Sequence, residues 1–234
     1  MISFLFSIKK GRTMGKRKDY DLDRIYKLSQ IELQRTAGDF QMPTLKPETV
    51  FPEGLIDFND AMRYDRFSSH VHFYMDDGKF ECLWRDPERY FSRLKSYAGI
   101  FTPNFSLYTD MPIAMQIWNT FRSRLIGQMM QSAGIKVIPS VTWADKGSFA
   151  FCFDGLPKNS IVAVSSVGVW RDKVFSRKFM RGLSAMIAAL EPSGIAFYGK
   201  VPSLDFGKIV IKNYPITTFE WKNLPKVVHY KENS

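Results

Sequence analysis

Residues 160–199 read SIVAVSSVGVWRDKVFSRKFMRGLSAMIAALEPSGIAFYG, and this stretch decides the fold. Residues 160–165 are small and β-branched, which is typical of a strand buried on both faces. Between residues 172 and 190, large apolar side chains, Phe175 and Phe179 among them, recur every three or four positions and predict a long helix with one apolar face. Residues 195–199 predict a second buried strand. A strand, a one-faced helix and another strand predict parallel pairing, with the helix packed on the sheet.

The same alternation continues on both sides of this stretch. Residues 148–153 fit either a strand or a helical turn. Six or seven strands covered by helices predict the α/β class, as a mostly parallel, doubly wound sheet or as a partial or distorted β/α barrel, and both architectures stay open. Further helices are expected at residues 86–97 and from Pro112 to about Gly134, and further strands at residues 55–58, 70–75, 105–108, 136–143 and 208–211.

Four segments follow from this pattern. Residues 1–18 are expected to form a flexible basic arm. Residues 19–54 contain a short amphipathic helix and then a connection rich in proline, which removes backbone donors and keeps the chain extended. Residues 55–214 are predicted to form a single α/β domain, and residues 215–234 a C-terminal tail.

The composition is that of an ordinary globular protein. The 234 residues include 33 Lys and Arg against 23 Asp and Glu, a net charge of +10, and 45% of them are hydrophobic. This mixture excludes wholesale disorder and the fibrous classes. Two cysteines, Cys82 and Cys152, are too few for a disulfide framework or a four-cysteine zinc site.

The apolar run near the start of the chain, residues 2–8, is too short to span a bilayer. Its positive charges follow the apolar run, whereas a secretory signal places them before it. We therefore expect a cytoplasmic protein with reduced thiols and no membrane partner. Met14 opens a typical start for a soluble protein, so residues 1–13 are either native sequence or translated upstream sequence.

The positive charge is concentrated at the N-terminus. Residues 1–18 contain no acid and carry +6, which leaves 10 − 6 = +4 for the remainder. A flexible basic arm binds nucleic acid by displacing counterions from phosphates; a solvated tail is the alternative interpretation. The predicted nucleic-acid-binding residues are Lys9, Lys10, Arg12, Lys16, Arg17 and Lys18.

Polar residues follow several of the predicted strands. Ligands of parallel α/β folds bind beyond the carboxyl ends of the strands, so these residues are expected to gather at one rim. Acids and hydroxyls can perform acid–base catalysis there, although the same residue types also cap helices and form turns. The predicted catalytic residues are Asp76, Asp110 and Ser165, and the predicted substrate-binding residues include Trp143 and Lys200, with Asn119 and Arg122 from the helix after Pro112.

His70 and His72 are two positions apart, so both imidazoles fall on one face of a strand. Zinc needs further ligands that no neighbouring motif supplies, and core histidines are the preferred interpretation, so no metal site is predicted. The sequence contains no Walker loop, dinucleotide-binding glycine motif, nucleophile elbow or HExxH motif. The sequence leaves the cofactor unknown, and whether the protein is an enzyme stays open.

A succession of motifs carries a resemblance. Residues 103–112 read PNFSLYTDMP, and WNTFR at 118–122, GIKVIPSVTW at 134–143 and FDG at 153–155 follow in order. From about residue 51 to 214 the chain resembles a family of bacterial, archaeal and phage proteins, the domain of unknown function 4417. The resemblance implies a protein of a phage, plasmid or other mobile element, and it adds Ser106 and Tyr108 to the predicted substrate-binding residues. Asn104 stands where Asp is frequent in that pattern, a departure that removes a carboxylate.

Three functions remain open. The favoured one is nucleic-acid association, in the replication or DNA metabolism of a mobile element, with the basic arm on the phosphates. The second is an α/β enzyme that acts on a nucleotide or another small substrate at the strand ends. The third is a non-catalytic interaction module.

Overall fold

The computed structural model describes residues 23–216, and the chain divides into two units, residues 1–31 and 32–234. In the first unit, the 3-10 turn η1 (Leu28–Gln30) lies close to Asp23. The Asp23 carboxylate accepts hydrogen bonds from the backbone N–H and the hydroxyl of Ser29, at 2.6 and 2.8 Å. The predicted basic arm and the last part of the predicted C-terminal tail, residues 217–234, lie outside the described residues.

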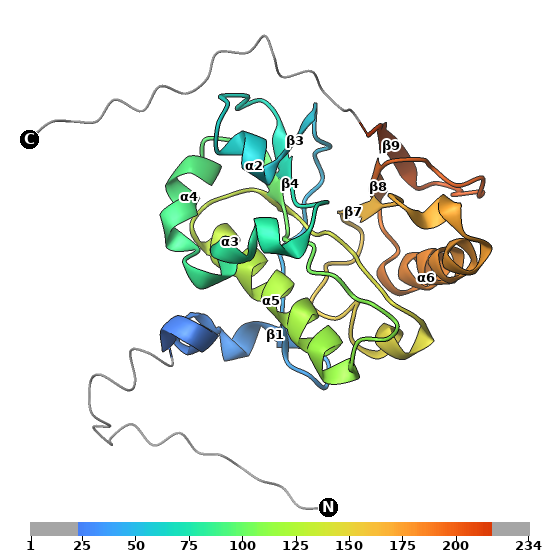
Figure 1. The fold of residues 1–234 in the computed structure, drawn as a ribbon, viewed down its shortest axis with the longest axis horizontal. Coiled ribbons are helices and arrows are strands. Elements are labelled where there is room, and N and C mark those ends of the chain that lie inside the picture. Colours follow the sequence, from blue (N-terminus) through green and yellow to red (C-terminus); the bar gives the residue numbers. More distant parts are fainter. Residues whose placement is uncertain (1–22, 217–234) are drawn as a thin grey trace, which may run out of the picture. The chain divides into compact units, whose positions relative to one another are not determined.

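The second unit has the predicted α/β class, because helices alternate along the chain with strands that pair in parallel (Figure 1). Its elements are η2 (Leu33–Arg35), β1 (Thr36–Ala37), β2 (Met42–Pro43), β3 (Leu55–Asp57), α2 (Phe58–Ala61), β4 (His70–His72), η3 (Asp77–Lys79), α3 (Glu81–Arg85), α4 (Glu88–Leu94), β5 (Gly99–Phe101), α5 (Ile113–Ser132), β6 (Val137–Ile138), η4 (Lys146–Ala150), β7 (Ile161–Ser165), η5 (Val169–Arg171), α6 (Lys173–Leu190), β8 (Gly194–Tyr198) and β9 (Val210–Tyr214).

Within residues 32–216, the strands from β3 to β9 run parallel and in sequential order. β3–β4–β5–β6 form one ladder and β7–β8–β9 another. A bridge between Ser140 and Ala163 joins the two ladders. Beside it, Val141 N–H donates to Ala163 O at 2.9 Å and Ala163 N–H to Pro139 O at 2.8 Å. Each strand therefore neighbours the next one in the chain, as repeated strand–helix units require.

The sheet curls strongly. The rings of His72 in β4 and Tyr198 in β8 lie 4.6 Å apart, whereas four strand spacings would separate them by about 19 Å in a flat sheet. At the last strand, the Tyr214 hydroxyl donates to Pro52 O, just before β3, at 2.6 Å. Among the described residues no ladder closes β9 onto β3. The partial β/α barrel is therefore the architecture of this unit.

Alternate strand residues face two separate cores. In β7, Ile161 and Ala163 belong to the core on the concave side, and Val162 and Val164 to the core under the helices. The predicted apolar face of α6 supplies Phe179, Leu183, Met186 and Leu190 to this second core. Phe175, which the periodicity placed on the same face, is 60% exposed at the N-terminal turn of α6.

Two local predictions differ from the structure. The predicted strand at residues 105–108 is wrong, because β5 ends at Phe101 and the chain beyond it runs irregularly along α5. The alternating Phe105 and Leu107 are buried, but against other parts of the fold and outside any ladder. Of the short helix predicted within residues 19–54, the described part is helical at residues 23–26, and the elements η1, η2 and β1 follow it. The undecided stretch 148–153 contains the end of the 3-10 helix η4.

Gly182 allows α6 to approach Trp143 closely. A Cβ atom at position 182 would lie 2.0 Å from Trp143 Nε1. We expect Gly182→Ala to lower the free energy of unfolding by about 2 kcal/mol, because the indole must move within a packed core. The gain in helix propensity, about 1 kcal/mol, offsets only part of a larger steric cost.

Urea denaturation measures this effect, with Ser184→Ala, an exposed change on the same helix, as the matched control. The control should change the free energy of unfolding by less than about 0.5 kcal/mol. If Gly182→Ala were as stable as the unmodified protein, Trp143 could not be a fixed part of this core.

Candidate functional site

The segment between β5 and α5 is held in place by polar side chains. Asn119 Nδ2 donates to Ser106 O at 2.8 Å, and Gln116 Nε2 donates to Tyr108 O at 3.0 Å. From η3, the Asp77 carboxylate accepts hydrogen bonds from Ser106 N and Oγ at 3.0 and 2.9 Å. The predicted residues Ser106 and Asn119 thus lie together, and their hydrogen bonds fix the backbone of this segment; substrate binding by them stays a prediction.

Arg122 ties this segment to α3. Its Nη1 donates to both carboxylate oxygens of Glu81 at 2.9 Å, and its Nη2 donates to Asn119 Oδ1 at 2.7 Å. The guanidinium carbon lies 3.9 Å from the centroid of the Phe105 ring, within the range of a cation–π interaction. The guanidinium is therefore already engaged by protein partners on two sides.

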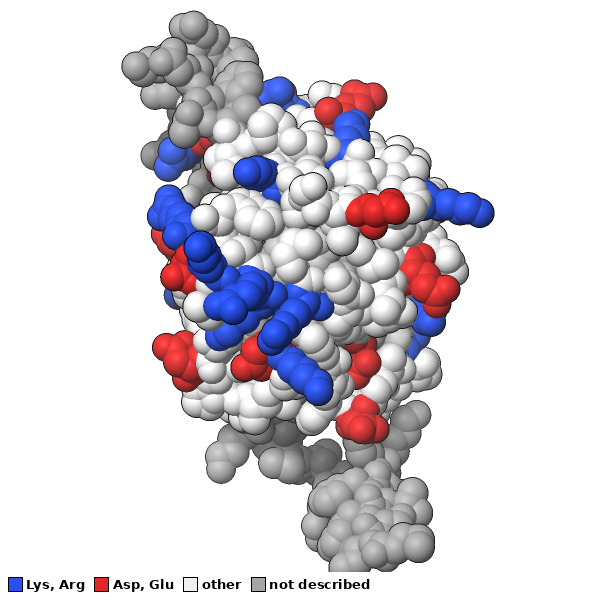
Figure 2. Space-filling view, turned by 90° about the vertical axis from the view of Figure 1, so that its right-hand side faces the viewer, with Lys and Arg blue, Asp and Glu red and all other residues white. Residues whose placement is uncertain are grey.

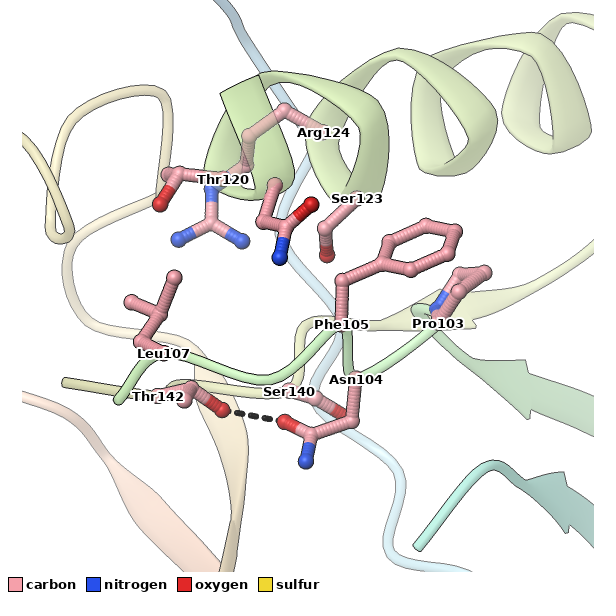
Figure 3. A pocket seen from close by; sticks show the side chains of 10 residues that line it. Pro103, Asn104, Phe105, Leu107, Thr120, Ser123, Arg124, Ser140 and Thr142 are labelled. Atoms are coloured by element: carbon pink, nitrogen blue, oxygen red, sulfur yellow. Dashed lines mark hydrogen bonds between the residues drawn. The ribbon is translucent and has the colours of Figure 1, made fainter. Parts of the chain in front are cut away.

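A small cavity lies between this segment, α5 and the residues after β6 (Figure 3). Its volume of about 10 Å³ corresponds to roughly one water molecule. The cavity is therefore too small for an organic substrate. The lining residues are Pro103, Asn104, Phe105, Leu107, Asn119, Thr120, Ser123, Arg124, Ser140 and Thr142.

Arg124 brings a buried cation to this cavity (Figure 3). Its guanidinium donates to Cys152 O at 2.8 Å and Asp154 O at 3.2 Å. Burial lowers the pKa of Arg124 to about 10, so it stays protonated at neutral pH. Opposite Arg124 in the same view, Asn104 Oδ1 accepts a hydrogen bond from the Thr142 hydroxyl. Asn104 thus joins the segment after β5 to the segment after β6.

An aromatic cluster inside the curled sheet was missed by sequence reasoning. The Tyr74 ring stacks on the rings of Tyr198 and His72, with centroid separations of 5.2 and 5.6 Å. His72 Nδ1 accepts a hydrogen bond from Tyr74 N–H at 3.3 Å. Burial lowers the pKa of His72 to about 4, although the nearby Asp57 carboxylate opposes that shift. The sequence analysis placed His72 and Tyr74 in one predicted strand, residues 70–75, but the curl that brings in Tyr198 leaves no local signal.

His70 lies at the other end of β4. It lines a cavity of about 220 Å³ together with Glu48, Phe51 and Lys136. Burial lowers the pKa of His70 to about 4, and its Nδ1 has no hydrogen-bond partner among the described residues. Within residues 23–216, no group of three or more His, Cys, Asp and Glu is arranged to hold a metal ion.

The remaining predicted rim residues are spread over several elements. Asp76 is exposed and lies 3.8 Å from the Lys79 ammonium, and Asp110 and Tyr108 are exposed before α5. Ser165 Oγ accepts a hydrogen bond from Val167 N–H at 3.3 Å. In the part of the chain that the structure describes, no hydrogen bond joins Asp76, Asp110 and Ser165. Their catalytic role stays a prediction.

Trp143 packs inward, and its ring centroid lies 5.4 Å from that of Phe179. The Phe179 ring in turn packs edge to face on Trp170 of η5, with the ring centroids 5.8 Å apart. Lys200, after β8, places its ammonium 6.0 Å from the Trp170 ring centroid, and its carbonyl accepts a hydrogen bond from Ser166 Oγ at 2.7 Å. The predicted residues Ser165 and Lys200 thus both border η5, at the start of α6.

A concentration of positive charge covers η5 and the outer side of α6. Figure 2 shows Lys and Arg gathered on the face that looks to the right in Figure 1, the side on which α6 lies. Residues 171–184 contain five basic residues and one acid, Asp172. We call these five residues, together with Lys200, the α6 basic surface: Arg171, Lys173, Arg177, Lys178, Arg181 and Lys200.

The positive charge of the α6 basic surface is largely uncompensated. Asp172 accepts hydrogen bonds from Val174 N and Phe175 N at 2.5 and 3.2 Å and so caps α6. Within residues 23–216, none of the six cations forms an ion pair with a carboxylate. Lys173, Arg177 and Arg181 are four residues apart and form one exposed stripe along the helix. Such a stripe attracts an extended polyanion.

Comparison with known proteins gives a family and two relatives. The family model described as "Domain of unknown function (DUF4417)" matches residues 34–215. The chain is 40% identical over 173 residues to the "Gene 1 protein" of Mycobacterium phage L5, covering 73% of this chain and 76% of that protein. It is 36% identical over 185 residues to the "Gene 1 protein" of Mycobacterium phage D29, covering 77% and 68%. No solved structure matches the chain.

Within residues 23–216, no helix is long and apolar enough to cross a bilayer. The longest, α5, carries buried polar residues such as Gln116, Asn119 and Arg124 along its length.

Proposed function

The chain belongs to the family of the domain of unknown function 4417, and on this premise we propose that it binds nucleic acid through the α6 basic surface. The uncompensated charge of that surface carries the proposal, because clustered Lys and Arg displace counterions from phosphates. The "Gene 1 protein" relatives are proteins of two phages, and a phage genome offers such a polyanion. The basic arm, residues 1–18, would add a second contact to the same nucleic acid.

Binding is measured by fluorescence anisotropy of labelled DNA with the full chain, over a salt series. The test variant is Arg177→Gln/Lys178→Gln/Arg181→Gln. At about 100 mM salt its affinity should fall about 10-fold or more, and the slope of log K against log salt should fall by about two. The loss follows from the phosphate contacts that three cations make.

The matched control removes the same charge elsewhere. Lys46, Arg89 and Lys95 are exposed. The helix α4, which contains Arg89 and ends just before Lys95, lies on the side away from α6 in Figure 1. Their triple Gln variant should bind within about twofold of the unmodified protein, because a net-charge effect alone is weak at this salt. Equal losses in both variants, or binding that does not respond to salt, would contradict the proposal.

A separate variant tests the arm. Replacing Lys9, Lys10, Arg12, Lys16, Arg17 and Lys18 by Gln should weaken binding further when combined with the α6 changes, because the contacts are independent. If the arm variant alone abolished binding and the α6 variant had no effect, the proposed location of the site would be wrong.

A further inference from the structure

The α6 basic surface contains exposed aromatic side chains among its cations. Phe175 is 60% exposed and Trp170 is 38% exposed. Single exposed apolar residues are common and need no explanation. Here two aromatic rings lie five positions apart: Trp170 directly precedes Arg171, and Phe175 lies between Lys173 and Arg177.

Packing holds the Trp170 ring in place, and a helix cap holds the backbone of Phe175. Trp170 contacts Phe179 edge to face, at 5.8 Å and 70°, so one part of its ring is anchored on the core while another part stays exposed. Phe175 lies in the first turn of α6, where the Asp172 carboxylate accepts the hydrogen bond from its N–H at 3.2 Å. The Trp170 ring, which is already ordered by this contact, loses little conformational freedom when a ligand stacks on it.

Lys200 adds a cation to the exposed indole, because its ammonium lies 6.0 Å from the Trp170 ring centroid. Arg171 and Lys173, both exposed, follow Trp170 in the chain. A base that stacks on Trp170 would therefore have positive charge within reach of its neighbouring phosphates. The combination of ring faces and cations matches the way in which proteins bind unpaired strands.

We infer that the α6 basic surface binds single-stranded nucleic acid, with bases stacked on Phe175 and Trp170; this inference rests on the proposed function. In a duplex the bases are stacked on each other and present no free ring face to a protein side chain. The cation stripe Lys173–Arg177–Arg181 serves the backbone of either form, but the two rings serve only an unpaired strand.

The experiment uses the full chain and three probes of one mixed sequence, about 20 nucleotides long: single-stranded DNA, single-stranded RNA and the DNA duplex. At about 100 mM salt, the single strands should bind roughly 10-fold more tightly than the duplex, as stacking on one or two rings predicts. Phe175→Ala should weaken single-strand binding about fivefold and leave duplex binding unchanged.

Two matched variants accompany this measurement. Val174→Ala removes an equally placed apolar side chain, 49% exposed, and should change binding less than about twofold, because an aliphatic side chain stacks poorly on bases. Trp170→Phe keeps a ring against Phe179 and should keep most of the affinity, while the quenching of intrinsic fluorescence by the single strand should decrease. Unchanged melting temperatures verify that each variant folds.

The outcomes separate the two proposals. A duplex that binds as tightly as the single strands, or a Phe175→Ala loss that is equal for both forms, overturns this inference and leaves the proposed function standing. If none of the three probes binds in a salt-dependent manner, both fail.

Discussion

Lowering the pH from 8 to 4.5 should reduce the free energy of unfolding by about 2–3 kcal/mol for each of two histidines, His70 and His72. Burial lowers the pKa of each to about 4, from an unfolded value of 6.5. Between those values the unfolded chain binds more protons than the folded one, so stability rises with pH across this window. The loss begins as the pH falls below about 6.5 and is complete below about 4.

The groups that face the two imidazoles decide the size of the effect. Glu48 favours protonation of His70, whereas Lys136 and Lys212 oppose it. Asp57 favours protonation of His72. In both cases the loss of hydration on burial outweighs these charges. The His72 ring lies inside the curled sheet, and the His70 ring is buried at the other end of β4. Burial raises the pKa of Asp60 and of Asp154, so these two carboxyls act in the opposite direction.

Urea denaturation at a series of pH values measures the slope directly. His72→Asn keeps an acceptor for Tyr74 N–H, and His70→Gln keeps a polar side chain of similar length. Each variant is expected to be less stable at pH 8, and each should remove about half of the change in stability between pH 6.5 and 4.5. A slope that persists in the double variant would assign the effect to other groups.

The second large effect is expected at Arg122. Arg122→Met removes the hydrogen bonds to Glu81 and Asn119 and the contact with the Phe105 ring. We expect a loss of about 2–3 kcal/mol, below the full cost of breaking a buried ion pair, because the Glu81 side chain is 36% exposed and water screens it. The backbone of the segment after β5 should also exchange its amide hydrogens faster, since Asn119 would lose its partner.

Two further variants complete this test. Arg89→Met removes an exposed cation 5.9 Å from the Tyr90 ring and should change stability by less than about 0.5 kcal/mol. Arg122→Lys keeps the charge but cannot reach Glu81 and Asn119 at once, so it should recover only part of the loss. If Arg122→Met were harmless while nucleic-acid binding fell, Arg122 would have a binding role in place of the structural one.

The sequence predicted the parts of the fold that depend on local periodicity. Residues 161–165 and the apolar face of α6 are confirmed, because strand and helix patterns repeat within a few residues. The curl of the sheet depends on contacts such as that between His72 and Tyr198, which lie far apart in the chain. Phe105 and Leu107 alternate as in a strand, but their burial comes from packing beside α5.

In the candidate site, too, the sequence predicted what depends on local spacing and missed what depends on distant contacts. The motif residues Ser106 and Asn119 do lie together, and α5 aligns them with Arg122 by helical spacing. The helical periodicity predicted Phe175 on the apolar face, but Phe175 lies in the first turn of α6, where it is exposed. The sequence analysis assigned the basic residues of functional interest to residues 1–18 and missed the α6 basic surface, because only the fold shows that no carboxylate of the described residues pairs with these cations.

Because the barrel is not closed, it has two edge strands whose unpaired backbone groups could pair with another chain. Within residues 32–216, β3 and β9 each lack a strand partner on one side, and such margins are templates for runaway polymerisation. Between β9 and the residues just before β3, the described contacts include two side-chain hydrogen bonds: the Tyr214 hydroxyl and the Lys212 ammonium both donate to Pro52 O. Lys212 and the prolines that flank these strands, Pro52 and Pro215, are the kinds of residue that resist fibre growth.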